Sequence, residues 1–179
     1  NDGNISQDKL EDCINSDLAN NYGNLCQRVT AFVIKNCHGK IPEKIKFEED
    51  DLKILNKFKD NLENIRSKID QQNLNFYIDY IVNSLFEANK YFNDQEPWKK
   101  KNEIIRLNTI IFTSLEIIRK ISFLLYPIIP GSVLKALKMF NLNENDIKLE
   151  DITKNEFLTK GNNLNKIDIL FKKIEKKND

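Results

Sequence analysis

The sequence predicts an all-α fold, a bundle of about five helices in a single domain. Only 5 glycines and 4 prolines occur in 179 residues, while 31% of the residues are charged and 40% are hydrophobic. Few turn residues and many charges favour long helices over many short strands. Long stretches also repeat apolar residues every three or four positions, which is the period of an amphipathic helix. A chain of this length buries a sizeable core as one domain.

The first helix is expected to run from about residue 6 to about residue 37, with a bend near residue 15. Ser6 is a suitable N-cap, and Asn15-Ser16-Asp17 gives a second start signal. Gly39 and then Pro42 end the helix in the order expected of a C-terminus. One apolar stripe connects these signals, formed by Leu18, Tyr22, Leu25, Val29 and Phe32.

Two further amphipathic helices are predicted between residues 48 and 97. The first extends from Glu48 to Ile69, and its polar face alternates Lys with Asp and Glu, as on a solvated surface helix. Residues 71–73 are expected to form the turn. The second helix begins near Phe76 and continues to Phe92, before Pro97 interrupts it.

The fourth segment, about residues 103–125, is apolar nearly all round its helical surface. Its length would suit a membrane span, but it also carries Arg106, Glu116, Arg119 and Lys120. Ionised groups at that density cost several kcal/mol in a bilayer. The segment is therefore predicted to be a central helix that its neighbours bury, and no membrane association is expected.

Prolines 127 and 130 then break the chain, and Ser132 is expected to cap a short helix that ends near Phe140. The helical bundle thus spans about residues 6–140. Residues 141–179 are predicted to form a polar, Asn-rich tail that ends in an amphipathic segment at about 164–176.

Several classes of chemistry are disfavoured. Cys13, Cys26 and Cys37 are odd in number and widely spaced, and His38 is the single histidine, so neither a metal site nor a disulfide framework is expected. Free cysteines and the lack of a signal-like start favour a reducing, cytoplasmic location. No phosphate-binding glycine loop or catalytic motif occurs, so these residues alone should catalyse nothing. With a net charge of +1, any nucleic-acid footprint must be local.

Pro97 and Trp98 are the first candidate binding residues. Trp98 is the only tryptophan, and it follows a proline and precedes three lysines. A flat aromatic ring beside positive charge suits stacking on an unpaired nucleic-acid base. A tryptophan that packs a loop onto the helices would explain the same residues, because tryptophan is on average highly buried.

A polar ridge on the first helix is the second candidate, formed by Asn20, Asn24 and Arg28 at successive turns. Asparagine offers both a donor and an acceptor to a base edge, and arginine makes forked contacts or stacks on a ring. The ridge suits a reader of single-stranded bases, and equally a solvated helix face.

Residues 14–29 read Ile-Asn-Ser-Asp-Leu-Ala-Asn-Asn-Tyr-Gly-Asn-Leu-Cys-Gln-Arg-Val. This run resembles the start of the anticodon-binding domain of bacterial methionyl-tRNA synthetases, which carry Asn-x-Asp-Leu-Ala-Asn-x-x-Gly-Asn-Leu-x-x-Arg there. The later Asn89-x-Tyr91-Phe92 followed by Pro97-Trp98 resembles the second landmark of the family. Both occur in the family's order, and residues 39–42 fit as well.

The resemblance implies a helical anticodon-binding domain of the class I synthetase type, whose partner is the anticodon loop of methionine tRNA. By position it assigns reading of the CAU anticodon to Asn24, Arg28 and Trp98, with Pro97 shaping the loop and Trp98 stacking on the first base. Supporting positions are Asn20, Asn89 and Tyr91.

The resemblance also implies a parent enzyme, a methionine–tRNA ligase that uses ATP, methionine and Mg. This chain lacks motifs of the His-Ile-Gly-His and Lys-Met-Ser-Lys-Ser types. We therefore expect a C-terminal fragment without the catalytic domain, with no cofactor or metal of its own, and monomeric.

Two alternatives remain at this point. One is the anticodon-binding module of another class I synthetase, for cysteine or a branched aliphatic amino acid, which shares the bundle but not the paired landmarks. The other is a helical protein-interaction scaffold, which the near-zero net charge favours. Proximity of Trp98 to Asn24 and Arg28 would favour the anticodon reader over the scaffold.

Overall fold

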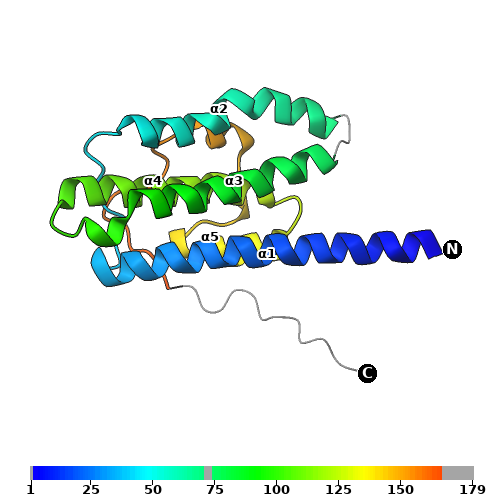
Figure 1. Cartoon of the computed structure of the whole chain (residues 1–179), viewed down its shortest axis with the longest axis horizontal. Coiled ribbons are helices and arrows are strands. Elements are labelled where there is room, and N and C mark those ends of the chain that lie inside the picture. The colour runs from blue at the N-terminus through cyan, green and yellow to red at the C-terminus, as the bar shows by residue number, and fades with distance from the viewer. Residues whose placement is uncertain (1, 71–73, 167–179) are drawn as a thin grey trace, which may run out of the picture.

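The computed structural model describes residues 2–70 and 74–166, and over these ranges the protein is a bundle of five α-helices (Figure 1). Short 3-10 helices follow α3 and α5, and the only β-type pairing in the described residues is one isolated bridge between Lys40 and Asn163. The predicted all-α class is thus confirmed. The α-helices are α1 (Asp2–Asn36), α2 (Glu49–Asp70), α3 (Leu74–Gln95), α4 (Ile104–Leu125) and α5 (Pro130–Leu137).

Helix α4 forms the centre of the bundle, as its sequence predicted. It packs against α1, α2, α3 and α5, and its side chains are buried almost without interruption from Leu107 to Leu125. Helices α1 and α3 run in the same direction, so the C-terminal end of α1 lies beside the turn that joins α3 to α4 (Figure 1). Within the part of the chain that the structure describes, no helix is both long and apolar enough to cross a bilayer.

Two predicted helix starts are wrong. Helix α1 begins at Asp2, so Ser6 lies inside it, and the helix continues without a break through residues 15–17. Those polar residues were read as a start signal, but the apolar stripe that begins at Leu18 packs on the core and keeps this turn helical. Helix α5 begins at Pro130, whose fixed φ angle suits the first helical position, so Ser132 falls in the first turn and Ile129 is the N-cap.

Residues 141–166 fold back onto the bundle, with two 3-10 helices at Glu144–Asp146 and Leu149–Thr153. Ile152, Leu158 and Leu164 are buried in the common core. The backbone N–H of Leu164 donates to the carbonyl of Gly39 at 2.7 Å, which ties this segment to the loop after α1. Of the amphipathic segment expected at 164–176, residues 164–166 are not helical and the rest lies outside the described residues.

The buried charges of α4 hold this returning segment. Arg119 pairs with Glu116 through Nε and Nη2, at 2.9 and 2.7 Å from Oε2. Its Nη1 and Nη2 also donate to the carbonyls of Asp151 and Lys154, both at 2.6 Å. Glu116 Oε1 accepts the backbone N–H of Leu158 at 2.8 Å. One buried ion pair therefore satisfies three backbone groups of the returning segment.

Lys120 provides a test of how these charges affect stability. Its Nζ donates to Asn155 Oδ1 at 2.7 Å, and Asn155 in turn donates to Asn56. Burial, reinforced by the charge of Arg119, lowers the pKa of Lys120 to about 7. A lysine of the unfolded chain has a pKa near 10.4. Between about pH 7 and pH 10.4, Lys120 is therefore protonated more fully in the unfolded state than in the folded state. The contribution of Lys120 therefore becomes more favourable as the pH rises above about 7.

We expect wild type to gain stability relative to Lys120→Met between about pH 7.5 and 9, by at most about 1.4 kcal/mol per pH unit. The difference isolates Lys120 from other groups that titrate in this range. Urea unfolding of both proteins at several pH values measures it. Parallel pH profiles for the two proteins would contradict the lowered pKa.

Candidate nucleic-acid interface

A sharp turn after α3 presents Trp98. Glu96 adopts a left-handed conformation, with φ 47° and ψ 57°, and Pro97 takes the first position of a 3-10 turn. Proline cannot continue the α-helix because it lacks a backbone N–H and its ring clashes with the preceding turn. The N–H of Lys99 closes the turn on the Glu96 carbonyl at 2.9 Å. As a result Pro97 is buried, while the Trp98 side chain is 41% exposed.

Arg28 of α1 lies against this tryptophan. Its guanidinium carbon is 5.8 Å from the centroid of the Trp98 ring and 4.8 Å from that of Phe92. Phe92 is only 2% exposed and meets Trp98 edge to face, with centroids 6.0 Å apart. A cation within about 6 Å of an aromatic face is attracted by the ring quadrupole. The two rings and the guanidinium thus form one unit, which we call the Trp98 platform.

Asn93 of α3 and Asn24 of α1 complete the surroundings. Arg28 Nη2 donates to the side-chain oxygen of Asn93, an uncharged amide, so this contact leaves the positive charge of Arg28 uncancelled. Asn24 is exposed one turn before Arg28, about 6 Å along the helix axis. The structure therefore brings Asn24, Arg28, Pro97 and Trp98 to one end of the bundle.

The three supporting positions are placed differently. Asn20 is exposed on α1, about 12 Å along the axis from Arg28. Asn89 is half-buried and donates to the Leu85 carbonyl of its own helix at 3.1 Å. Tyr91 is buried, and its hydroxyl donates to Asp51 of α2. Tyr91 therefore faces the interior of the bundle and is not part of the exposed surface.

Behind the turn, Asp51 and Arg106 connect α2, α3 and the start of α4. Arg106 makes a forked contact with Asp51, at 2.6 and 3.0 Å, and its Nη2 also donates to Gln95 Oε1 at 2.9 Å. Burial alone would raise the pKa of Asp51, but hydrogen bonds from Arg106 and Tyr91 outweigh it and hold the pKa below its usual value. These contacts fix the end of α3, and thereby the position from which the Trp98 turn starts.

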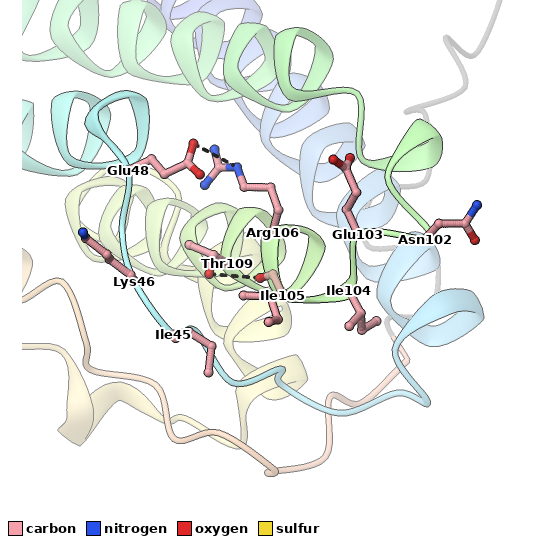
Figure 2. Close-up of a pocket in the computed structure, with 9 residues that line it drawn as sticks. All are labelled: Ile45, Lys46, Glu48, Asn102, Glu103, Ile104, Ile105, Arg106 and Thr109. Carbon is pink, nitrogen blue, oxygen red and sulfur yellow. Dashed lines mark hydrogen bonds and ion pairs between the residues drawn. The ribbon is translucent and has the colours of Figure 1, made fainter.

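An open pocket of about 450 Å³ lies beside this network, at the start of α4 (Figure 2). Ile45, Ile104 and Ile105 give it an apolar lining, and Arg106 also pairs with Glu48 at its edge, with 3.4 Å between Nε and Oε2. Over residues 2–70 and 74–166, no group of three or more His, Cys, Asp or Glu side chains could hold a metal ion.

Sequence reasoning missed Phe92 and Asn93 as parts of the site. Phe92 supports both Arg28 and Trp98, and Asn93 holds the guanidinium in place. The sequence placed Phe92 in the apolar stripe of its helix and within the second landmark, without a role at the site. Only the packing of α1 beside the end of α3 shows that these residues meet Arg28.

A family described as the anticodon binding domain of methionyl tRNA ligase matches residues 41–179. The methionine–tRNA ligase of Brucella suis is 34% identical over 152 residues, which are 84% of this chain and 30% of that protein. The ligase of Rickettsia conorii is 34% identical over 182 residues, covering 97% of this chain and 35% of that protein.

Solved structures agree with these sequence matches. The apo methionyl-tRNA synthetase of Mycobacterium tuberculosis matches with a TM-score of 0.77 and 31% identity, over 86% of this chain and 32% of that chain. The same enzyme bound by methionyl-adenylate matches with a TM-score of 0.80 and 30% identity, over 89% and 32%. This chain thus spans about a third of the length of such relatives. The resemblance read from the sequence is confirmed: the chain belongs to the family of anticodon-binding domains of methionyl-tRNA ligases.

Proposed function

We propose that this chain reads the CAU anticodon of methionine tRNA. The observation that carries the proposal is the half-exposed Trp98 ring, supported from below by Phe92 and flanked by the Arg28 guanidinium. An exposed ring fixed on a buried one offers a flat surface to an unpaired base at little cost in side-chain entropy. Arg28 adds a positive charge at the same place for the RNA backbone or a base edge.

Each residue has a role in this proposal. Trp98 stacks on the first anticodon base, and Pro97 sets the turn that presents it. Arg28 and Asn24 contact the base edges, with Asn20 and Asn89 flanking them further from the turn. Tyr91 supports the surface indirectly, through its hydrogen bond to Asp51.

The proposal extends to the protein of which this domain is part. Its relatives are methionine–tRNA ligases, and one of them was solved with methionyl-adenylate bound. We infer that the whole protein ligates methionine to its tRNA with ATP and Mg, in a catalytic domain that this chain does not include. We also infer that it works as a monomer in the cytoplasm.

The fluorescence of Trp98 tests the proposed anticodon recognition directly, because the sequence contains no other tryptophan. We expect an RNA hairpin with a CAU loop to change this fluorescence on titration, and to bind at least about tenfold more tightly than a hairpin with an altered anticodon. Low salt strengthens the phosphate contacts and makes weak binding measurable. Equal affinity for all hairpins, or binding without a change in Trp98 emission, would contradict the proposal.

A further inference from the structure

We propose that Phe86 of α3 is a second stacking platform, for another unpaired base of the same RNA; this inference rests on the proposed function. The Phe86 side chain is 65% exposed, the highest value among the large hydrophobic side chains whose burial the structure describes. Its neighbour one turn earlier, Val82, is 46% exposed. The core of the bundle does not use this ring.

The packing of α1 beside α3 places Phe86 near exposed asparagines of α1. The two helices run parallel and in contact, and the hydrogen bond from Arg28 to Asn93 joins residues 65 positions apart. At the other end of the pair, Ile14 and Ile78 line one small pocket at nearly the same offset. The rings of Phe32 and Phe92, 60 positions apart, also meet. These contacts place Phe86 level with residues 21–26 of α1, among which Asn21 and Asn24 are exposed.

Phe86 lies on the same face of α3 as Asn93. The two residues are seven positions apart, which is about two helical turns and about 10 Å along the axis. Because Asn93 reaches Arg28 from this face, Phe86 lies on the side of α3 that meets the Trp98 platform. Asn89 lies between Phe86 and Asn93 on the same helix.

The chemistry of this surface favours a nucleic-acid base over a protein helix. On α1 the exposed side chains level with Phe86 are the amides Asn21 and Asn24, each with a donor and an acceptor for a base edge. On α3 the exposed polar neighbours one turn away are Asn83 and Lys90, and Lys90 pairs with Asp94. A docked helix would require apolar anchors along several turns, whereas the exposed apolar side chains of this stripe are only Val82 and Phe86. The exposed carboxylate of Asp17, one turn before Asn21 on α1, limits a polyanion to the stretch between Phe86 and Trp98.

The spacing indicates that Phe86 and Trp98 meet different bases. The axial rise from Phe86 to Phe92, which contacts Trp98, is about 9 Å, whereas stacked nucleotides follow one another at about 3.4 Å. Trp98 takes the first anticodon base in the proposed function, so Phe86 stacks on another unpaired nucleotide of the same loop.

Phe86→Ala tests this platform. We expect the variant to bind the CAU hairpin at least about fivefold more weakly, while the Trp98 fluorescence change at saturation stays the same. Phe86→Tyr, which keeps a flat ring, should restore most of the affinity. Leu74→Ala is the matched control, because it truncates another exposed apolar side chain near the start of the same helix and should leave binding unchanged. Circular dichroism and thermal unfolding check that all variants fold alike.

Hairpins with one abasic loop nucleotide at a time identify the stacked base. With one of the abasic hairpins, Phe86→Ala should bind as tightly as the wild-type chain does. Trp98→Ala should match the wild-type affinity with a hairpin that is abasic at a different position. If the wild-type chain binds the hairpin through Trp98 but Phe86→Ala binds equally well, the second platform is wrong and the proposed function stands. If no hairpin affects Trp98, the proposed function itself fails, and this inference with it.

Discussion

Trp98→Ala in the full-length synthetase is expected to lower kcat/KM for tRNA charging by about fivefold to 150-fold, and to leave methionine activation unchanged. Stacking of a base on an aromatic ring contributes roughly 1–3 kcal/mol per base, which converts to this range. The rate of aminoacylation is compared with the ATP–pyrophosphate exchange rate, which does not require tRNA. In the proposed function, the chemistry of activation belongs to residues outside this domain, so the two rates should separate.

A matched substitution shows whether the ring itself is responsible. Trp98→Phe keeps a flat surface on Phe92 and should retain much of the charging activity. Because Trp98 is 41% exposed, its truncation should shift thermal unfolding only slightly. A parallel loss of charging and activation would instead indicate damage to the fold, and would refute a role confined to the anticodon.

Apolar periodicity predicted the helices well because a helix in a bundle must bury one stripe. The stripe from Leu18 onward and the nearly all-apolar α4 both lie in the core. Boundaries were predicted less well, because capping residues act locally and are worth only about 1 kcal/mol. Packing of the stripe kept α1 helical through Ser16 and Asp17, against that local preference.

The site was predictable from sequence only where family landmarks marked it. Arg28 and Trp98 meet in the structure, but nothing in their local patterns reveals which residues join them. Phe92 and Asn93 act at the site through the packing of two helices. Tyr91 precedes Phe92 in sequence, but neighbours in a helix point about 100° apart, so its side chain reaches Asp51 of α2 and not Arg28 of α1.

The returning segment at 141–166 was misread as a polar tail for a related physical reason. Its contacts with Arg119 use the backbone carbonyls of Asp151 and Lys154, and backbone groups leave no mark in a sequence. The available signal was the charge within the apolar α4. It was read as evidence against a membrane span, whereas a buried charge also requires a partner from elsewhere in the fold.

Arg119→Met is expected to destabilise the domain by about 3–5 kcal/mol, because it leaves the buried Glu116 carboxylate without its cation. In many proteins, replacing both members of a buried pair with apolar residues restores stability. Here the double variant Glu116→Leu/Arg119→Met should remain destabilised. It also removes the partners of the carbonyls of Asp151 and Lys154 and of the N–H of Leu158. Each buried backbone group left unpaired costs about 1–3 kcal/mol.

Urea unfolding of the single and double variants measures these differences, and limited proteolysis reports on the returning segment. Lys160→Ala is the control: its Nζ pairs with Glu43 at the surface, where an ion pair contributes about 0–1 kcal/mol, and the substitution leaves every backbone group in place. We expect cleavage between residues 141 and 166 to accelerate in both α4 variants but not in the control. A double variant as stable and as resistant as wild type would show that the segment is held by its apolar side chains alone. If the double variant is less stable and is cleaved faster than wild type, the buried charges of α4 hold the returning segment by pairing with its backbone groups.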